Sequence, residues 1–452
     1  MTGPGLLAQL VSATEPAALL PNRSGTATTG VAHLTLLDHL VLGPNLAVLV
    51  VVDHEGGLHV VPAVHDGSGV RRAVAGDGLA EALIRLLVGR PGGDGRFVVR
   101  KLHGRVVSGE RAMGVDQTNE SLVVGETAVV KWLNHVSSDL HPAPGRLSLL
   151  DAAGFTSMPQ PWGFLFWRDD DDRDVLLVAV DQFLPSATNG WSWCVDDVRR
   201  LVRGELTMPD SLVPPATVGA MVASMHSGFA SAGVAVADPA ERSSWYRQAL
   251  SALDAAVVEV DGPEGERLRR RAGEIRDHLR AWESPDDVMV LAVHGDLHVG
   301  QVLRYQRADG DVDYAVTDFD GNPVLTAGQR TAPQPAARDV AGYLQSLDHV
   351  GRVVVRRTAG VDAGLVGTWI TKAQSSFLGA YIRGMEEAGL RHAVQERLLS
   401  PLRVEQECRE YLYAVRYDPV WRYVPDAAMG ALLESLRGPR SAPQHDPHPE
   451  ET

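Results

Sequence analysis

The stretch from residue 294 to residue 323 constrains this chain more than any other. It reads HGDLHVGQ, then an apolar segment, a turn and TDFDGNP. Residues 302–305 and 314–317 have the apolar pattern of short strands separated by turn residues, which predicts a hairpin. Because a hairpin brings the ends of its two strands together, we expect Asp296 and Asp318 to lie near one another.

The spacing of the polar residues in this stretch is typical of phosphoryl-transfer sites. Such sites need one carboxylate to orient the attacking hydroxyl and further oxygen ligands to hold Mg²⁺ on the phosphates. Kinase-like folds supply them as HxDxxxxN followed by a second Asp, which assigns Asp296 as the base and Asp318 as a metal ligand. Gln301 stands five residues after Asp296, in place of the Asn, and offers the same amide oxygen on a longer stem. The alternative is an unrelated His-Asp loop and acidic turn, and the complete ordered set argues against it.

These segments resemble a known family. HGDLHVGQVLR, DFDGNP and the RDVAG segment at 338–342 are similar to the actinobacterial maltokinases, relatives of the aminoglycoside phosphotransferases, whose loop reads HGDLHLGQ and whose metal segment reads DFEGEP. The resemblance runs, with gaps, from about residue 114 to residue 436. Asp320 and Asn322 depart from that pattern, which has Glu at both places. These departures indicate a sister branch, and the chain resembles the glucosamine kinases within the same group.

The resemblance implies an α+β fold that is bilobal and protein-kinase-like (aminoglycoside phosphotransferase-like), with an N-terminal cap. Residues 1–105 are the expected cap, residues 106–185 the small lobe with the phosphate loop, and residues 186–437 the large helical lobe with the catalytic loop and the sugar pocket. The polar composition of residues 438–452 is typical of a disordered tail. The resemblance also implies ATP as co-substrate and Mg²⁺, as two ions, as cofactor.

The remaining element patterns agree with this division. Residues 46–53 have the pattern of a strand, and helical spacing begins beyond the hinge, for example at 215–231, where Pro214 and Pro215 suit a helix start. The continuous apolar run at 288–293 predicts a buried strand that leads into the catalytic loop.

Lys131 is the candidate anchor for the α- and β-phosphates. It lies in the apolar run TAVVKW, where an unpaired charge is costly. The alternative is a strand-end Lys that reaches solvent. Kinases pair this Lys with a Glu on the next helix, but the corresponding segment, HPAPGRLSLLDAAGF, has no Glu at the matching place. Asp139 or Asp151 could substitute, or Lys131 could rely on phosphate alone, and the sequence leaves this open.

Two further segments are assigned to ATP by the resemblance. The QTNES loop that ends in Ser121 is similar to the QSNSS-type loop of maltokinases, which covers the phosphates with backbone N–H groups and hydroxyls. Without the resemblance, this polar loop could equally be the tip of a surface hairpin. The segment after the run at 175–180 looks like the hinge between lobes, where backbone groups meet adenine, and Gln182 and Leu184 are the expected contacts.

The C-terminal helical block carries aromatic and acidic residues mostly at three- and four-residue intervals, so they share much of one helix face. A sugar stacks its C–H face on aromatic rings and bonds its hydroxyls to carboxylates. An ordinary helix with buried aromatics explains the spacing as well, and only the resemblance favours a sugar pocket. The stripe comprises Gln406, Glu407, Glu410, Tyr413, Tyr417 and Trp421.

The expected reaction is transfer of the γ-phosphate of ATP to the 6-hydroxyl of glucosamine. A protonated amine needs a carboxylate when it is desolvated, and Glu410 is the first candidate, followed by Asp320 and Glu407. The alternatives are a maltokinase, which converts maltose to maltose 1-phosphate, and a nucleotide-binding pseudokinase or regulatory partner, suggested by the missing helix Glu. The expected substrate contacts are Asp296, His298, Asp320, Glu407, Glu410, Tyr417 and Trp421.

Length and composition limit the number of domains, the cellular location and the classes of partner. A chain of 452 residues suggests two or three domains, and 44% hydrophobic with 22% charged residues is typical of a globular protein. Two cysteines, no signal peptide and no long apolar segment predict a cytoplasmic protein without a membrane partner. The net charge of −15 argues against general nucleic-acid binding, and a monomer is slightly favoured.

Overall fold

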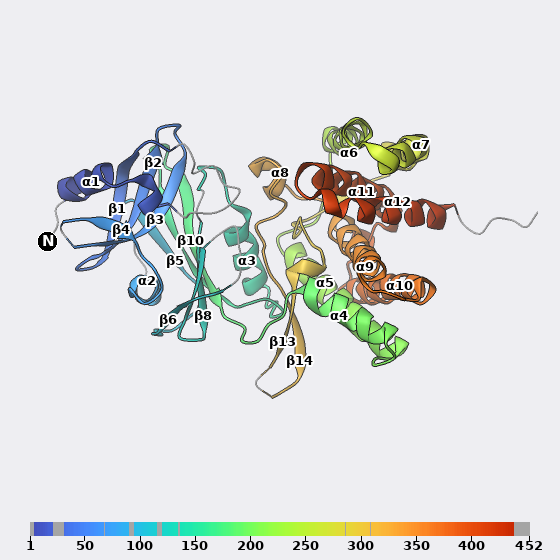
Figure 1. Cartoon of the computed structure of the whole chain (residues 1–452), viewed down its shortest axis with the longest axis horizontal. Coiled ribbons are helices and arrows are strands. Elements are labelled where there is room, and N and C mark those ends of the chain that lie inside the picture. Colours follow the sequence, from blue (N-terminus) through green and yellow to red (C-terminus); the bar gives the residue numbers. More distant parts are fainter. Residues whose placement is uncertain are drawn as a thin grey trace, which may run out of the picture.

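The computed structural model describes residues 4–20, 31–66, 68–89, 95–114, 120–133, 136–284, 286–307 and 309–437. Strands dominate the N-terminal part and helices the C-terminal part, and the two parts meet around α3 and the β13–β14 hairpin (Figure 1). The predictions for the loop residues Gln117, Thr118 and Asn119, and for the tail at 438–452, lie outside the described residues.

The N-terminal part is an antiparallel sheet in the order β1-β2-β3-β4. Successive side chains of a strand point to opposite faces of the sheet, so β2 contributes to two cores. Leu49 and Val51 pack with Val11 of α1, whereas Val48 and Val50 pack on the small lobe. The elements are α1 (Pro4–Ala13), a 3₁₀ helix (Pro16–Ala18), β1 (Leu34–Gly43), β2 (Leu46–Asp53), β3 (Leu58–His65) and β4 (Val70–Arg72).

The small lobe contains a six-stranded antiparallel sheet in the order β5-β9-β10-β8-β7-β6. Leu83 of α2 and Val48 of the cap share one apolar core with Val130 of this sheet. Strand β5 lies within the predicted cap, so sheet membership favours a cap that ends before Phe97 rather than at residue 105. The elements are α2 (Leu79–Val88), β5 (Phe97–Lys101), β6 (Glu110–Ala112), β7 (Glu120–Val124), β8 (Ala128–Trp132), α3 (Pro142–Ala152), β9 (Pro161–Arg168) and β10 (Asp174–Gln182).

The large lobe is built around the packing of α5 on α10, with α9 beside them. Its core includes Met225, Tyr343 and Phe377, and the rings of the last two are stacked at 4.5 Å. The helices are α4 (Gly190–Val202), α5 (Met208–Ala230), α6 (Pro239–Glu259), α7 (Gly262–Leu279), α8 (Ala327–Thr331), α9 (Ala337–Arg357), α10 (Ala363–Glu387), α11 (Leu399–Arg416) and α12 (Tyr423–Leu436). Short 3₁₀ helices span Arg280–Glu283, Val299–Gln301, Arg391–Ala393, Glu396–Leu398 and Pro419–Arg422. Two strand pairs complete the lobe: β11 (Ala235–Val236) pairs with β12 (Met289–Val290), and β13 (Val302–Gln306) pairs with β14 (Val312–Val316).

Two expectations for the large lobe were wrong. The apolar run at 288–293 forms a strand only at β12, because Val288 and Val290 are buried by packing with residues of α9 and α11 rather than inside a wide sheet. Helix α5 begins before Pro214 and Pro215, since Thr207 caps it by accepting a hydrogen bond from the N–H of Asp210. Both prolines therefore lie inside the helix.

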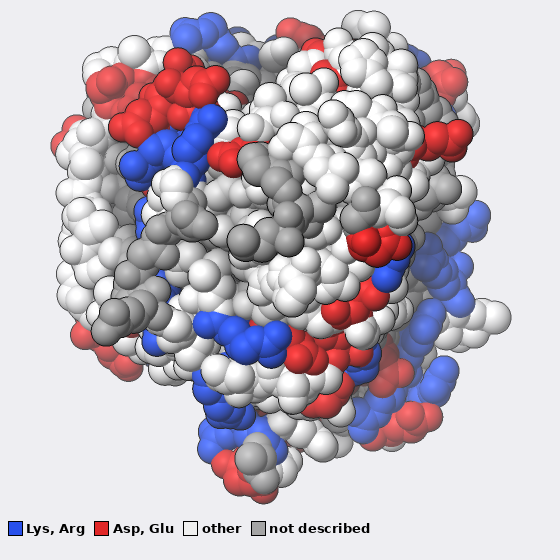
Figure 2. All heavy atoms as spheres, turned by 90° about the vertical axis from the view of Figure 1, so that its left-hand side faces the viewer, with Lys and Arg blue, Asp and Glu red and all other residues white. Residues whose placement is uncertain are grey.

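The surface carries charges of both signs. On the face shown in Figure 2, groups of Lys and Arg lie next to groups of Asp and Glu. Across the described ranges, no helix combines the length and the apolar character that crossing a bilayer requires. The cytoplasmic location, the monomeric state and the absence of nucleic-acid binding stay predictions.

Candidate active site

The catalytic loop is anchored by Asp339, in the first turn of α9. Its buried carboxylate accepts hydrogen bonds from the backbone N–H groups of His294, at 2.7 Å, and of Gly295, at 2.9 Å. The His294 ring reaches the segment that follows β14, where its Nε2 donates to the carbonyl oxygen of Thr317 at 2.9 Å. The loop is therefore tied both to a rigid helix and to the segment after β14.

Asp296 is the next residue of this loop. Its Oδ1 accepts a hydrogen bond from Asn322 Nδ2 at 3.1 Å, which fixes the carboxylate. Burial is the main cause that raises the pKa of Asp296 to about 7, and the carboxylates of Asp318 and Glu410 add to it. A positioned carboxylate that titrates near neutral pH is suited to accept the proton of a hydroxyl.

Gln301 and Asp318 lie side by side, as the hairpin predicts. Gln301 Nε2 donates to Asp318 Oδ2 at 3.2 Å. His298 closes the loop, because its Nδ1 accepts a hydrogen bond from the N–H of Gly300 at 3.0 Å and its Nε2 lies 3.3 Å from Gln301 Nε2. Burial lowers the pKa of His298 to about 4, so its ring is neutral at physiological pH.

This pair fits the chemistry of Mg²⁺. An amide oxygen and a carboxylate are the hard ligands that Mg²⁺ takes, and the Asp318 side chain is 46% exposed, so its oxygens are accessible. In the described part of the chain, no cluster of three or more His, Cys, Asp or Glu forms a complete metal cage. Magnesium sites that take one or two protein ligands and complete their shell with phosphate oxygens and water match this donor set.

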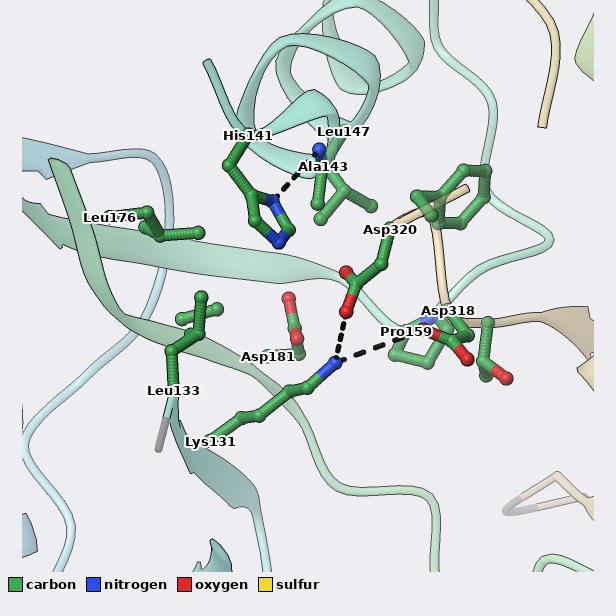
Figure 3. Close-up of a pocket in the computed structure, with 13 residues that line it drawn as sticks. Lys131, Leu133, His141, Ala143, Leu147, Pro159, Leu176, Asp181, Asp318 and Asp320 are labelled. Atoms are coloured by element: carbon green, nitrogen blue, oxygen red, sulfur yellow. Dashed lines mark hydrogen bonds and ion pairs between the residues drawn. The ribbon is translucent and has the colours of Figure 1, made fainter. Parts of the chain in front are cut away.

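Lys131 of β8 lies in the cavity where the two lobes meet, and its ammonium group faces two carboxylates (Figure 3). Its Nζ is 2.8 Å from Asp320 Oδ2 and 3.8 Å from Asp318 Oδ1. Asp320 was expected as an alternative partner of the sugar amine, and that contact stays a prediction beside the observed ion pair with Lys131. Of the substitutes considered for the missing helix Glu, Asp151 is instead bound to His103 Nε2 at 2.8 Å.

Ser121 and Asp181 lie near Lys131. Ser121 of β7 stands directly opposite Lys131 in the strand register, so both side chains are on one face of the sheet. Asp181, at the end of β10, also lines the cavity beside Lys131 (Figure 3). Burial raises the pKa of Asp181 to about 7, and the charge of Lys131 opposes this increase.

Two backbone N–H groups of the predicted hinge form hydrogen bonds within the small lobe. The N–H of Gln182 donates to the carbonyl oxygen of Gln160 at 2.8 Å, and the N–H of Phe183 donates to that of Thr127 at 2.7 Å. These two N–H groups are therefore engaged within the protein. The adenine contacts of Gln182 and Leu184 stay predictions.

Glu410 and Trp421 form a polar and aromatic corner near Asp296. The indole Nε1 of Trp421 donates to Glu410 Oε2 at 3.1 Å, and Gln406 Nε2 donates to Oε1 at 3.1 Å. Trp191 of α4 packs edge-on against Trp421, with ring centroids 5.8 Å apart. Because Glu410 also acts on the pKa of Asp296, this corner faces the predicted base.

Glu407 lies one helical turn away, beneath this corner. It is fully buried, and its Oε1 accepts hydrogen bonds from His349 Nε2 at 2.7 Å and from the amide of Gln345. Burial lowers the pKa of His349, but the Glu407 carboxylate more than reverses this effect and raises it to about 9. The charged His349 ring packs edge-on against Trp421 at 6.1 Å. Glu407 thus contacts the corner through His349, and its contact with the sugar stays a prediction.

The predicted stripe breaks after α11. That helix ends at Arg416, and Tyr417 is 68% exposed with its ring 5.6 Å from that of Tyr413. Tyr417 therefore lies outside the period of α11, and its contact with the sugar stays a prediction. The 3₁₀ helix Pro419–Arg422 turns the chain back and brings Trp421 to the site.

Comparison with known proteins identifies the family. No family model matches the chain. A glucosamine kinase from Streptacidiphilus jiangxiensis is 47% identical over 432 residues, which cover 94% of this chain and 97% of that protein. A glucosamine kinase from Mycolicibacterium smegmatis is 40% identical over 401 residues, or 88% of this chain and 98% of that protein. The chain belongs to the glucosamine kinase family.

A solved structure agrees with this assignment. A glucosamine kinase in complex with glucosamine, ADP and inorganic phosphate matches with a TM-score of 0.83 at 46% identity. The match covers 96% of this chain and 100% of that chain. A crystal form of a glucosamine kinase matches with a TM-score of 0.84 at 45% identity, over 94% of this chain and 99% of that one. The predicted α+β bilobal fold and the predicted family are confirmed.

Sequence reasoning missed several residues of this glucosamine kinase family site. Asn322 was noted only as a departure from DFEGEP, although an amide two residues after Asp320 could have signalled a partner for the base. Trp191 follows Gly190, whose position leaves no space for a Cβ beside the carbonyl of Val299. A Gly before an aromatic residue was the available signal of that close approach.

Proposed function

We propose that this chain transfers the γ-phosphate of ATP to the 6-hydroxyl of glucosamine, giving glucosamine 6-phosphate. The observation that carries the proposal is that Asn322, two residues after the Lys131 partner Asp320, holds the carboxylate of Asp296. Glu410, which is bound to Trp421, is close enough to Asp296 for its charge to raise the pKa of Asp296. The identity to glucosamine kinases over most of the chain supports this substrate class.

Asp296 is the proposed base. Its carboxylate would accept the hydrogen bond of the sugar hydroxyl and align the oxygen with the phosphorus atom. Asn322 holds this carboxylate in one orientation through the 3.1 Å hydrogen bond. Burial, with a smaller contribution from the neighbouring acidic groups, raises its pKa to about 7 and makes the carboxylate a stronger base than an ordinary Asp.

Lys131 would anchor the α- and β-phosphates, with Ser121 beside it and Leu184 at the adenine. Gln301 and Asp318 would hold Mg²⁺, which neutralises the charge of the transferring phosphoryl group when it is bound. His298 supports Gln301 from within the loop and lies on the sugar side of it. Two ions are proposed, as the resemblance implies.

The sugar is proposed to bind against Trp421, with its protonated amine near Glu410. A carboxylate that already accepts hydrogen bonds from Trp421 and Gln406 is fixed in position and keeps lone pairs for a charged donor. Trp191 would provide a second aromatic surface. Maltose, the substrate of the alternative reading, has no amine for Glu410 to bind.

The proposal is tested by ATP consumption with glucosamine, glucose and maltose, with and without Mg²⁺, followed by NMR identification of the product. The expected result is Mg²⁺-dependent formation of glucosamine 6-phosphate. ATP binding without turnover of any sugar would favour the pseudokinase alternative. Phosphate at the anomeric carbon of maltose would favour the maltokinase alternative.

A further inference from the structure

The phosphate-anchoring Lys of kinase-like sites is usually held by a carboxylate on the following helix. Helix α3 has the sequence PAPGRLSLLDA, so Asp151 is its single acidic residue. The Asp151 carboxylate lies at the end of the helix and is bound to His103 through both oxygens at 2.8 Å. Helix α3 therefore gives Lys131 no carboxylate, and the lysine must be held from elsewhere.

Asp320 is the carboxylate in contact with Lys131. Its Oδ2 lies 2.8 Å from Nζ, a hydrogen-bonding distance, and the carboxylate points toward the ammonium group within the cavity (Figure 3). The two side chains are only 25% and 26% exposed, so this ion pair is largely shielded from solvent.

The second carboxylate near Lys131 is not equivalent to the first. Asp318 Oδ1 is 3.8 Å from Nζ, beyond hydrogen-bonding distance, and the other oxygen is bound by Gln301. The Asp318 side chain is 46% exposed, against 26% for Asp320. Asp318 thus faces the open cleft with Gln301, whereas Asp320 is turned inward to the lysine.

Helix α3 contributes a cation instead of a carboxylate. Arg146 Nη1 donates to the carbonyl oxygen of Phe319, the residue before Asp320, at 2.8 Å, and Nη2 donates to that of Arg330 at 2.6 Å. The guanidinium is buried, and Gly321 lies so close to it that a Cβ there would collide. Arg146 therefore holds the backbone of the segment that carries Asp320.

We propose that Asp320 is the positioning residue that holds Lys131 against the phosphates of ATP, in place of the helix Glu of other kinases, and that α3 acts on this pair through Arg146. The inference rests on the proposed function and assigns the partner that the sequence left open. The pair joins β8 of the small lobe to the segment after β14 of the large lobe. The position of the lysine consequently depends on how closely the lobes approach.

The test is a double-mutant cycle on ATP affinity, measured by calorimetry in Mg²⁺ with the full chain. Asp320→Asn is expected to weaken ATP binding roughly tenfold to a hundredfold, the range for loss of a charge-assisted hydrogen bond. In a Lys131→Met background the same change should cost about threefold or less, because paired residues are not additive. Asp151→Asn, the matched control on α3, should leave ATP affinity unchanged, and the KM for glucosamine should stay constant in D320N.

Three outcomes would overturn the inference. Unchanged ATP affinity in D320N would remove Asp320 from this role. An equal loss in both backgrounds, or a raised Mg²⁺ requirement like that of an Asp318 variant, would make Asp320 a metal ligand instead. If D320N does not fold, D320E with and without K131M provides the same comparison. A wild-type chain that binds no ATP would refute the proposed function itself, which is a separate result.

Discussion

Glu410 and Trp421 are joined by a hydrogen bond of 3.1 Å from the indole Nε1 to the carboxylate Oε2, although one lies inside α11 and the other in the turn beyond it. This contact fixes an acidic group and an aromatic ring at the same corner. The same carboxylate is close enough to Asp296 to raise its pKa. The pair thus links the proposed amine site to the proposed base.

Substitution Glu410→Gln is expected to remove the preference for an amino sugar. The amide keeps the shape and the hydrogen bond to Trp421 but loses the charge that pairs with the ammonium group. The ratio of kcat/KM for glucosamine over glucose should fall roughly tenfold to a hundredfold. Glu387→Gln, at the exposed end of α10, is the control and should leave the ratio unchanged. An unaltered ratio in E410Q would exclude Glu410 as the amine partner.

Substitution Asp296→Asn is expected to lower kcat by at least about a hundredfold, as for a lost general base. The affinity for ATP should stay close to that of the wild type, because Lys131 and the hinge are untouched. Steady-state kinetics and calorimetry measure the two quantities separately. Wild-type turnover in this variant would remove Asp296 from the mechanism.

The raised pKa of Asp296 predicts a pH dependence with a defined sign. Below about 7 the carboxyl group is protonated and cannot accept the hydroxyl proton, so kcat should fall about tenfold per pH unit on the acid side. Glu410→Gln removes one of the charges that raise this pKa, so the acid limb should move to lower pH. A profile that is level across this range, or unmoved in E410Q, contradicts the assignment.

The local part of the site was predictable because hairpin geometry fixes it. Gln301 comes directly before β13 and Asp318 comes soon after β14, so both lie at the open end of the hairpin. Strand pairing brings Gln301 Nε2 to 3.2 Å from Asp318 Oδ2, whatever the rest of the fold. The partner of Lys131 was not predictable in this way. Asp320 is 189 positions away in the chain, and only the packing of the two lobes brings it to the lysine.

The C-terminal stripe shows the limit of helical spacing. Glu407 and Glu410 follow the period of α11, but one is buried with His349 and the other faces the site, because neighbouring helices rather than spacing decide exposure. Tyr417 was assigned by extending the period past Arg416, where the helix ends. The period has no meaning beyond that residue, and Asp418-Pro419 was the available signal for the turn that returns Trp421.

Substitution Asp318→Asn is expected to raise the Mg²⁺ concentration needed for half-maximal activity sharply, because a charged oxygen ligand is lost. A Mg²⁺ titration at saturating ATP and glucosamine measures this. Asp313→Asn, in β14 at the turn end of the hairpin, is the control. A wild-type titration curve for D318N would refute the metal assignment.

The central claim is that the site selects a sugar by its protonated amine, and the ratios of kcat/KM for glucosamine, N-acetylglucosamine, glucose and maltose test it most directly. Glucosamine is expected to exceed glucose roughly tenfold to a hundredfold, and acetylation of the amine should remove the advantage. If maltose has the highest kcat/KM, or if acetylation costs nothing, charge pairing at Glu410 does not determine the substrate.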